Sequence, residues 1–307
     1  MDILLQPPGD EADAWRTALA AALPGARIAV WPEAPEYPDY ALVWKPPVEL
    51  FARAGPVKAI FNLGAGVNAI LDVASLPAGV PIIRLEDAGM AAQMAEYVTL
   101  AVLRDYREAD AYAALQHAGR WLRRPRFEKA EFGVGILGFG VLGVAVARAL
   151  MPFGFPIAAW SRTRKTAPGV ASFSGPAELP AFLAASRVLV CLLPSTPATR
   201  GLIDRDALDG LPRGAHLINV ARGEIVVDED LIAALDAGRL SAATLDVFRD
   251  EPLPAGHPFW HHPRITLTPH RSAVTLVDDS VTQIAAKIRR LERGESVTGV
   301  VDRARGY

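Results

Sequence analysis

The sequence predicts an α/β protein with two doubly wound parallel-sheet domains, one flavodoxin-like and one Rossmann-like. Short apolar runs alternate with helical patterns in the first third of the 307 residues, and again after Glu131. A G-x-G-x-x-G turn lies far from the N-terminus, at Gly138–Gly143. Long helical patterns flank the second alternation. We therefore expect a nucleotide-binding domain inserted into a split substrate domain.

Alternating patterns in the first third predict a small parallel sheet with helices on its faces. After them, a helical pattern without internal proline runs from about Gly89 to His117, long enough to bridge two domains. The expected strands are Ile3–Leu5, Arg27–Trp31, Tyr40–Trp44, Val57–Asn62 and Val80–Leu85, and the expected helices are Glu11–Ala22, Val48–Ala54 and a short piece after Val67.

The second alternation predicts six strands with intervening helices, as in a dinucleotide-binding domain. A last long helix is expected from Ala273 to Glu292, ended by Gly294. We assign residues 1–100 and 273–307 to the substrate domain and residues 101–272 to the nucleotide-binding Rossmann domain, with a binding cleft between them. The expected strands are Phe132–Leu137, Ile157–Trp160, Val188–Leu193, His216–Val220, Ala243–Val247 and Ile265–Leu267, and the helices are Val141–Met151, Ala177–Ala185, Arg205–Asp209 and Glu229–Ala237.

Composition excludes several classes of function. The formal net charge is −2, so no basic excess favours nucleic acid or an anionic membrane surface. A single cysteine, Cys191, lies in an apolar run and is expected to be a buried thiol in a reducing, cytoplasmic setting. No signal peptide or membrane span is expected. His257, His261 and His262 fit no standard ligand spacing, so we expect a loop and no metal site.

The glycine turn predicts a pyrophosphate site. Gly138 would make the tight turn, Gly140 would let the backbone approach the phosphate, and Gly143 would let the helix pack close to the strand. The helix that follows would offer unpaired N–H groups to the negative charge.

The end of the next strand favours NADPH over NADH. An NAD site usually has a carboxylate for the ribose 2′-OH about 20 residues after the turn. Here the chain reads Ser161-Arg162-Thr163-Arg164-Lys165, with cations where a 2′-phosphate would lie. Arg162 is the first choice for the phosphate contact, Lys165 the second and Arg164 the third. The alternative is a solvated basic turn.

Three polar segments follow predicted strands, at the edge where an open parallel sheet places its chemistry. They contain Arg222, Glu251 and His270. Reduction of a 2-oxo acid needs a cation for the substrate carboxylate and carbonyl, which Arg222 can supply. It also needs an acid, which His270 can supply, with Glu251 holding the imidazole in one tautomer and favouring its charged form. Taken singly, each residue has an ordinary structural explanation.

These segments resemble the D-isomer-specific 2-hydroxyacid dehydrogenase family, and the likeness covers nearly the whole chain. More narrowly, several segments resemble the bacterial glyoxylate/hydroxypyruvate reductase A type. The segments that carry the likeness are Val220–Gly223, Leu245–Phe248, Glu251–Pro254, Thr268–His270, Leu63–Val67, Ala41–Trp44, Arg84–Asp87, Gln93–Met94, Trp160–Lys165 and Val301–Tyr307.

The resemblance implies NADPH-dependent reduction of glyoxylate to glycolate and of hydroxypyruvate to D-glycerate. It also implies a homodimer whose interface includes the helix near Gly89–His117, with Trp121 matching a tryptophan that closes the partner's site. The chain departs from the family's pattern at two positions. Arg271 follows the proposed acid, and Lys45, after Trp44, is expected to point to solvent.

The site residues expected on this basis fall into three groups. The catalytic residues are Arg222, Glu251 and His270; the substrate-binding residues are Trp44, Ala65, Gly66, Arg222 and His270; and the cofactor-binding residues are Gly138, Gly140, Val141, Leu142, Gly143, Ser161, Arg162, Thr163, Lys165, Leu193, Pro194, Val220, Ala221, Arg222, Asp246 and His270.

Two other functions stay open at this point. One is a dehydrogenase of another 2-oxo acid, such as pyruvate or phenylpyruvate, because the sequence does not determine pocket size. The other is a non-catalytic NADP(H)-sensing protein, which would bind the dinucleotide and turn over poorly.

Overall fold

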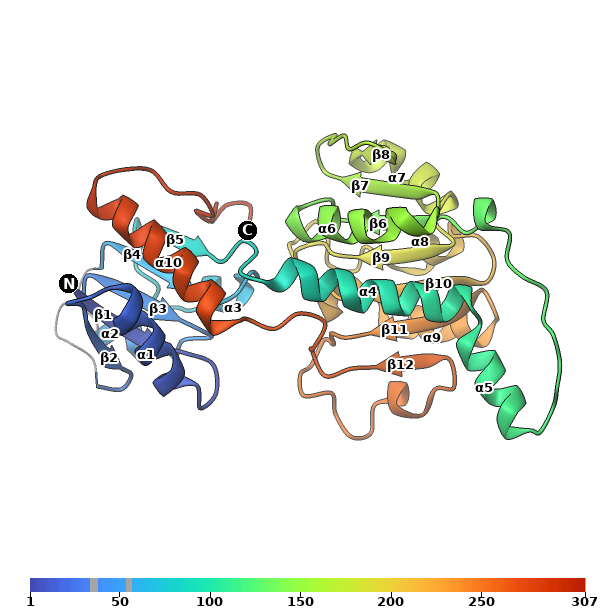
Figure 1. The fold of residues 1–307 in the computed structure, drawn as a ribbon, viewed down its shortest axis with the longest axis horizontal. Helices are drawn as coiled ribbons and strands as arrows, with labels where there is room; N and C mark the ends of the chain where they lie inside the picture. Colours follow the sequence, from blue (N-terminus) through green and yellow to red (C-terminus); the bar gives the residue numbers. More distant parts are fainter. Residues whose placement is uncertain (34–37, 54–56, 307) are drawn as a thin grey trace. The chain divides into compact units, whose positions relative to one another are not determined.

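The computed structural model describes residues 1–33, 38–53 and 57–306 (Figure 1). The chain divides into two compact units. Unit 1 is Met1–Met90 together with Thr275–Tyr307, and unit 2 is Ala91–Val274. Each unit has its own sheet and its own core. Among the described residues, no helix is both long and apolar enough to cross a lipid bilayer.

Unit 1 contains a five-stranded sheet in the order β2-β1-β3-β4-β5, with every pair parallel (Figure 1). This is the flavodoxin-like order. Helices α1 and α10 contact each other, so the two ends of the chain share one layer over the sheet. The strands are β1 (Asp2–Gln6), β2 (Arg27–Val30), β3 (Tyr40–Val43), β4 (Ala59–Asn62) and β5 (Ile82–Arg84), and the helices are α1 (Ala12–Ala22), α2 (Val48–Arg53), α3 (Asn68–Leu71) and α10 (Val277–Glu292).

Unit 2 contains a seven-stranded sheet in the order β12-β11-β10-β9-β6-β7-β8, again all parallel. Counted from β6, the first six strands have the order 3-2-1-4-5-6 of a dinucleotide-binding fold, with a seventh strand added beyond the sixth. The strands are β6 (Val134–Leu137), β7 (Ile157–Ser161), β8 (Val170–Ser174), β9 (Val188–Cys191), β10 (Ala215–Asn219), β11 (Leu240–Leu245) and β12 (Ile265–Leu267).

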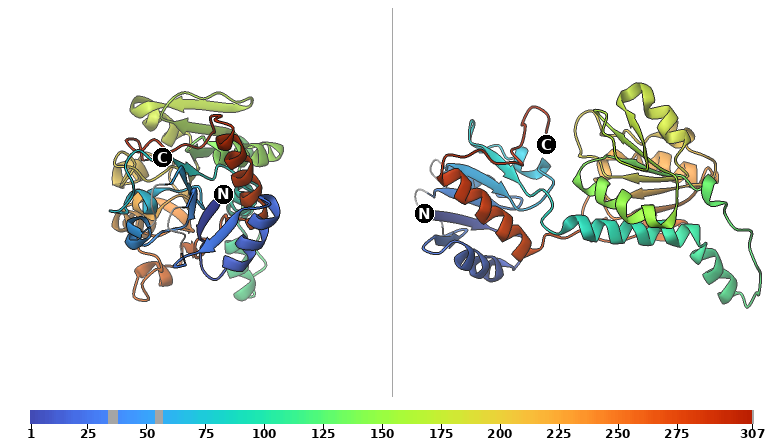
Figure 2. Two further views of the ribbon diagram at one scale, coloured as in Figure 1. Left: turned by 90° about the vertical axis from the view of Figure 1, so that its left-hand side faces the viewer. Right: turned by 45° about the horizontal axis from the view of Figure 1, so that its top comes forward.

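Helices cover both faces of this sheet (Figure 2). Successive strand residues point to opposite faces, so Val188 and Val190 pack in one core and Leu189 and Cys191 in the other. Helices α4 and α6 cover the first face, and α7, α8 and α9 the second. Their bounds are α4 (Met90–Tyr106), α5 (Ala109–His117), α6 (Val141–Leu150), α7 (Gly175–Ala184), α8 (Arg205–Asp209) and α9 (Asp228–Asp236), and the 3₁₀ turns are η1 (Lys129–Glu131), η2 (Met151–Phe153), η3 (Gly223–Ile225) and η4 (Pro258–His261).

The predicted fold class is confirmed, with corrections to single elements. The second sheet has a seventh strand that the sequence did not predict, β8, because its half-exposed residues at the sheet edge lack an apolar run. The helix expected from Gly89 to His117 is broken at Glu108, whose φ of 53° is left-handed and ends the helical path. The last helix begins at Val277 instead of Ala273. Ala54, the expected end of a helix, lies outside the described residues, as does Tyr307.

Candidate functional site

The glycine turn lies at the switch point of the second sheet, between β6 and β9, where open α/β sheets bind their ligands. Gly138 has φ 114°, and a Cβ there would lie 2.8 Å from the backbone of Leu192. A Cβ on Gly143 would lie 2.3 Å from the carbonyl oxygen of Gly138. Gly140 has nothing within 4 Å of its Cβ position, so its backbone is open to a ligand. The three glycines therefore have the geometry expected for close phosphate approach.

The first turn of α6 presents N–H donors to this space. Among the described parts of the chain, nothing accepts a hydrogen bond from the N–H groups of Gly140, Val141 and Leu142. Lys165 donates from Nζ to the carbonyl oxygen of Phe139 at 3.0 Å, which fastens the segment after β7 to the glycine turn. Unpaired N–H groups, the helix dipole and a nearby cation together make an anion site.

The basic segment after β7 divides into cations with different surroundings. Arg164 is turned toward α7, where it pairs with Glu178 and donates to the carbonyl oxygen of Ser172. Ser161 is buried and donates to the carbonyl oxygen of Thr163 at 2.8 Å, which shapes the turn. Arg162 is exposed. With Arg164 engaged by Glu178, Arg162 and Lys165 are the cations best suited to a phosphate.

Arg222 follows β10 in a turn that Asn219 shapes. The Asn219 side chain accepts from the N–H of Ala221 at 3.2 Å and donates to the carbonyl oxygen of Arg222 at 3.1 Å. The Arg222 guanidinium donates to the carbonyl oxygen of Ala221 at 2.5 Å. Burial lowers the pKa of Arg222, and the negative charges of Glu251 and Glu224 counteract that effect. Arg222 is thus a half-buried cation, and the partial loss of water strengthens its attraction for a carboxylate.

His270 and Glu251 form the hydrogen bond that the sequence predicts. His270 Nδ1 lies 2.8 Å from Glu251 Oε2, and the two side chains are 42% and 28% exposed. The other oxygen of Glu251 accepts from the N–H of Phe248 at 3.1 Å. Because a carboxylate only accepts, Nδ1 is assigned as the protonated nitrogen, and Nε2 is left to face a ligand.

Asp246 holds the turn that carries His270. Its carboxylate accepts from Thr268 Oγ1 at 2.5 Å, from the N–H of Arg271 at 2.7 Å and from the N–H of Ser272 at 2.8 Å. Tyr97 Oη lies 2.5 Å from Thr268 Oγ1 and extends the chain of bonds to α4.

These bonds explain the backbone of His270, whose φ of 54° is left-handed and costly for a non-glycine residue. The sequence predicts Asp246 as a cofactor contact, and that remains a prediction. In the structure its side chain is fully buried and bonds to the turn that carries His270.

In unit 1, the loop after β4 also presents free N–H groups. Asn62 donates from Nδ2 to the carbonyl oxygens of Gly64 and Gly66 at 2.9 and 3.0 Å. Because these carbonyl groups point toward Asn62, the N–H groups of the loop point away from it. No described residue accepts from the N–H groups of Gly64, Ala65 and Gly66. Successive N–H groups of this kind form a concave anion site.

Trp44 packs on the same loop. A Cβ on Gly64 would lie 2.2 Å from the Trp44 ring, so only glycine permits this contact. Lys45 is exposed, as expected, with its ammonium 5.8 Å from the centre of the Trp44 ring.

The histidines of the 257–262 segment and Cys191 have surroundings that explain them without a metal site or a catalytic role. Within the described ranges, no group of three or more His, Cys, Asp or Glu side chains could hold a metal ion. His257 Nε2 lies 3.6 Å from Asp228 Oδ2, and His262 Nε2 lies 3.3 Å from Asp236 Oδ1. Burial raises the pKa of the Cys191 thiol to about 12, so this cysteine is no nucleophile.

Sequence reasoning missed the residues that hold the site in place. Asn62, Asn219 and Thr268 are polar residues at or just after the ends of strands, and Tyr97 lies on α4. Their polarity at the end of an apolar run was a signal. The partners of Thr268 and Tyr97 were not visible, because those bonds join segments that only the fold brings together. The bonds of Asn62 and Asn219 are local, within four residues, and depend on the conformation of the turn.

Known proteins share this architecture. The family model "D-isomer specific 2-hydroxyacid dehydrogenase, NAD binding domain" matches residues 98–272. A glyoxylate/hydroxypyruvate reductase A of Salmonella paratyphi B is 50% identical over 313 residues, covering 100% of both chains.

Two solved structures are also similar over the whole chain. A D-isomer specific 2-hydroxyacid dehydrogenase of Xanthobacter autotrophicus Py2, in complex with NADPH and MES, is 43% identical with a TM-score of 0.95, covering 100% of this chain and 99% of that one. An NADPH-dependent glyoxylate/hydroxypyruvate reductase of Sinorhizobium meliloti, in complex with NADP and sulfate, is 35% identical with a TM-score of 0.94 and the same coverage. The predicted family is therefore confirmed, and the chain belongs to the D-isomer specific 2-hydroxyacid dehydrogenases.

Proposed function

We propose that this protein reduces small 2-oxo acids with NADPH, converting glyoxylate to glycolate and hydroxypyruvate to D-glycerate. The observation that carries the proposal is the 2.8 Å bond between His270 and Glu251, together with the half-buried Arg222, whose charge interacts with Glu251. The relatives named above support the choice of substrates and of NADPH.

The proposed cofactor fits the residues present. The open backbone at Gly140 and the unpaired N–H groups of α6 suit a pyrophosphate. Arg162 and Lys165 suit a 2′-phosphate, and no carboxylate lies between Ser161 and Lys165 to favour the NAD ribose. NADPH, when bound, supplies the hydride.

The chain's own residues supply binding and the proton. Arg222 would bind the substrate carboxylate and polarise the 2-oxo group through paired donors. His270 would donate a proton from Nε2 to the carbonyl oxygen as the carbon is reduced, while Glu251 holds the ring through Nδ1. In unit 1, the N–H groups of Ala65 and Gly66 suit the substrate carboxylate, and Trp44 supports their loop.

The direct test is the oxidation of NADPH in the presence of glyoxylate, hydroxypyruvate, pyruvate and phenylpyruvate, repeated with NADH. We expect turnover with the first two and preference for NADPH. His270→Gln should lower kcat by about 10²- to 10⁴-fold while NADPH still binds. Binding without turnover on any 2-oxo acid would favour an NADP(H)-sensing protein and overturn the proposal.

We also infer a homodimer formed through α4 and the segment after α5. A shallow apolar hollow of about 470 Å³ lies between α4 and α6, lined by Leu100, Leu103 and Phe153 among others. Trp121 is 96% exposed, an unusual state for a tryptophan of a monomer. Light scattering should give twice the chain mass, and Trp121→Ala should lower activity without dissociating the dimer. A monomeric mass would refute this inference.

A further inference from the structure

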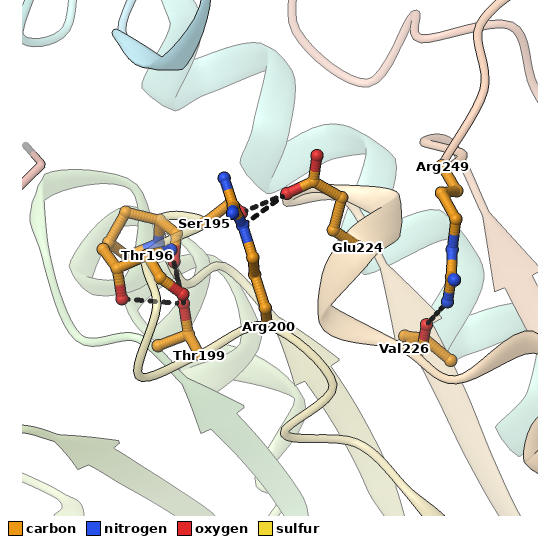
Figure 3. A network of polar contacts seen from close by, with 8 residues as sticks. Ser195, Thr196, Thr199, Arg200, Glu224, Val226 and Arg249 are labelled. Atoms are coloured by element: carbon orange, nitrogen blue, oxygen red, sulfur yellow. Dashed lines mark hydrogen bonds and ion pairs between the residues drawn. The ribbon is translucent and has the colours of Figure 1, made fainter. Parts of the chain in front are cut away.

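The carboxylate of Glu224 joins two loops at the carboxyl end of the second sheet (Figure 3). Its Oε2 accepts from Ser195 Oγ at 2.6 Å and from Arg200 Nε at 3.1 Å. Ser195 and Arg200 belong to the loop that follows β9, whereas Glu224 lies two residues after Arg222. The Glu224 carboxylate therefore links the β9 loop to the loop of the proposed catalytic arginine, in addition to backbone hydrogen bonds between them.

Hydrogen bonds within the β9 loop surround this contact. Thr199 Oγ1 accepts from the N–H of Thr196 at 2.8 Å and donates to the carbonyl oxygen of Pro194 at 2.6 Å (Figure 3). The N–H of Gly201 donates to the carbonyl oxygen of Glu224 at 2.9 Å, and Ile203 pairs with Val226. These bonds tie the β9 loop together and join it to the segment that follows Arg222.

One side of the β9 loop borders the glycine turn. The loop begins at Leu192 and Leu193, whose backbone lies against Gly138, within 3.0 Å of the position of a Cβ. A shift of the β9 loop would therefore change the space over the proposed pyrophosphate site.

The other side borders the catalytic trio. A Cβ on Gly223 would lie 2.0 Å from the carbonyl carbon of Phe248, so the two backbones are in direct contact. The N–H of Phe248 in turn donates to Glu251. Arg249 approaches the same segment and donates to the carbonyl oxygen of Val226 at 3.5 Å (Figure 3). The Glu224 turn is thus confined between the β9 loop and the Glu251 loop.

Global stability is a poor explanation for this contact. The side chains of Glu224 and Arg200 are 45% and 54% exposed, and exposed ion pairs contribute little to folding. Ser195 is buried, and its bond to a carboxylate is charge-assisted and directional. Such a bond fixes geometry more than it adds stability.

We propose that Glu224 is a positioning residue that sets the β9 loop against the Arg222 loop, and thereby aligns the NADPH site with the cation for the 2-oxo acid. This inference rests on the proposed function for its substrates, but its effect on NADPH affinity can be measured without turnover.

The test compares Glu224→Ala, Glu224→Gln and Ser195→Ala, with Glu229→Gln as the control. Glu229 is an exposed carboxylate on α9 whose side chain makes no hydrogen bond or ion pair with any described residue. We expect Glu224→Ala to raise the dissociation constant of NADPH and to lower kcat/KM for glyoxylate, each by about tenfold. Glutamine keeps an acceptor for Ser195, so Glu224→Gln should restore NADPH affinity to within about twofold.

A double-mutant cycle separates positioning from independent local effects. The double variant combines Glu224→Ala with Ser195→Ala. If Glu224 acts through Ser195, its dissociation constant for NADPH should be no higher than that of Glu224→Ala alone, because both changes break the same bond. Additive losses, or NADPH affinity in Glu224→Ala equal to that of the Glu229 control, would overturn the proposal. If the wild type binds NADPH but reduces no 2-oxo acid, the proposed function fails while the affinity comparison still decides the role of Glu224.

Discussion

Replacing Asp246 by Asn tests whether its carboxylate holds the His270 turn. The change keeps the shape of a fully buried side chain and removes only its charge and one acceptor oxygen. Asp246 now accepts three bonds, from Thr268, Arg271 and Ser272. In the variant, the amide NH₂ group must face at least one of these donors.

The expected loss follows from these bonds. A hydrogen bond to a charged group contributes about 1.5–3 kcal/mol, and a buried donor without an acceptor costs about 1–3 kcal/mol. We therefore expect the free energy of unfolding to fall by roughly 3–5 kcal/mol. For a unit of this size, that corresponds to a decrease in Tm of roughly 6–20 °C. Because His270 loses its support at φ 54°, kcat should also fall by about tenfold.

Thermal unfolding and NADPH oxidation with glyoxylate measure the two effects. Asp206→Asn is the matched control, since Asp206 is exposed in the first turn of α8. A Tm and a kcat equal to those of the control would refute the claim that Asp246 shapes the catalytic turn. Lower stability with normal kcat would mean that His270 reaches its position without Asp246.

Three further predictions concern other parts of the chain. Arg162→Ala should reduce the preference for NADPH over NADH by about 10- to 100-fold, because a charged donor to the 2′-phosphate is lost; Arg164→Ala, whose side chain pairs with Glu178, should leave the ratio unchanged, and equal effects would refute the assignment. Gly138→Ala should abolish NADPH binding and lower Tm, because a Cβ would meet the Leu192 backbone at 2.8 Å; normal binding in titrations would contradict this geometry. Burial opposes the charge on Glu86, but bonds from Thr298 and Lys287 hold its pKa below the ordinary value of 4.5. The stability from this group is therefore present above about pH 4.5 and is lost as the pH falls through the lowered pKa. Lys287→Met should weaken this loss in thermal unfolding across acid pH, and an unchanged pH profile would refute the pairing.

Much of this molecule follows from local patterns in the chain. Alternating apolar runs and helical patterns predict two parallel α/β sheets, because a strand buried on both faces needs continuous apolar residues. The glycine turn predicts its own geometry, since close backbone approach excludes a Cβ at Gly138 and Gly143. Arg222, Glu251 and His270 could be proposed because each follows a strand of a parallel sheet, and such strands end at one edge. The edge strand β8 was missed because its half-exposed residues do not form a continuous apolar run.

The sequence by itself therefore determined the fold class and the family, and it singled out the candidate reacting groups. Only the tertiary structure decided how those groups are held. Asp246 supports the turn that carries His270, Lys165 bonds to the glycine turn, and Glu224 bonds to Ser195. The physical reason is that periodicity is a property of neighbours along the chain. A hydrogen bond between residues 25 or 29 positions apart depends on distances that exist only after the sheets have formed.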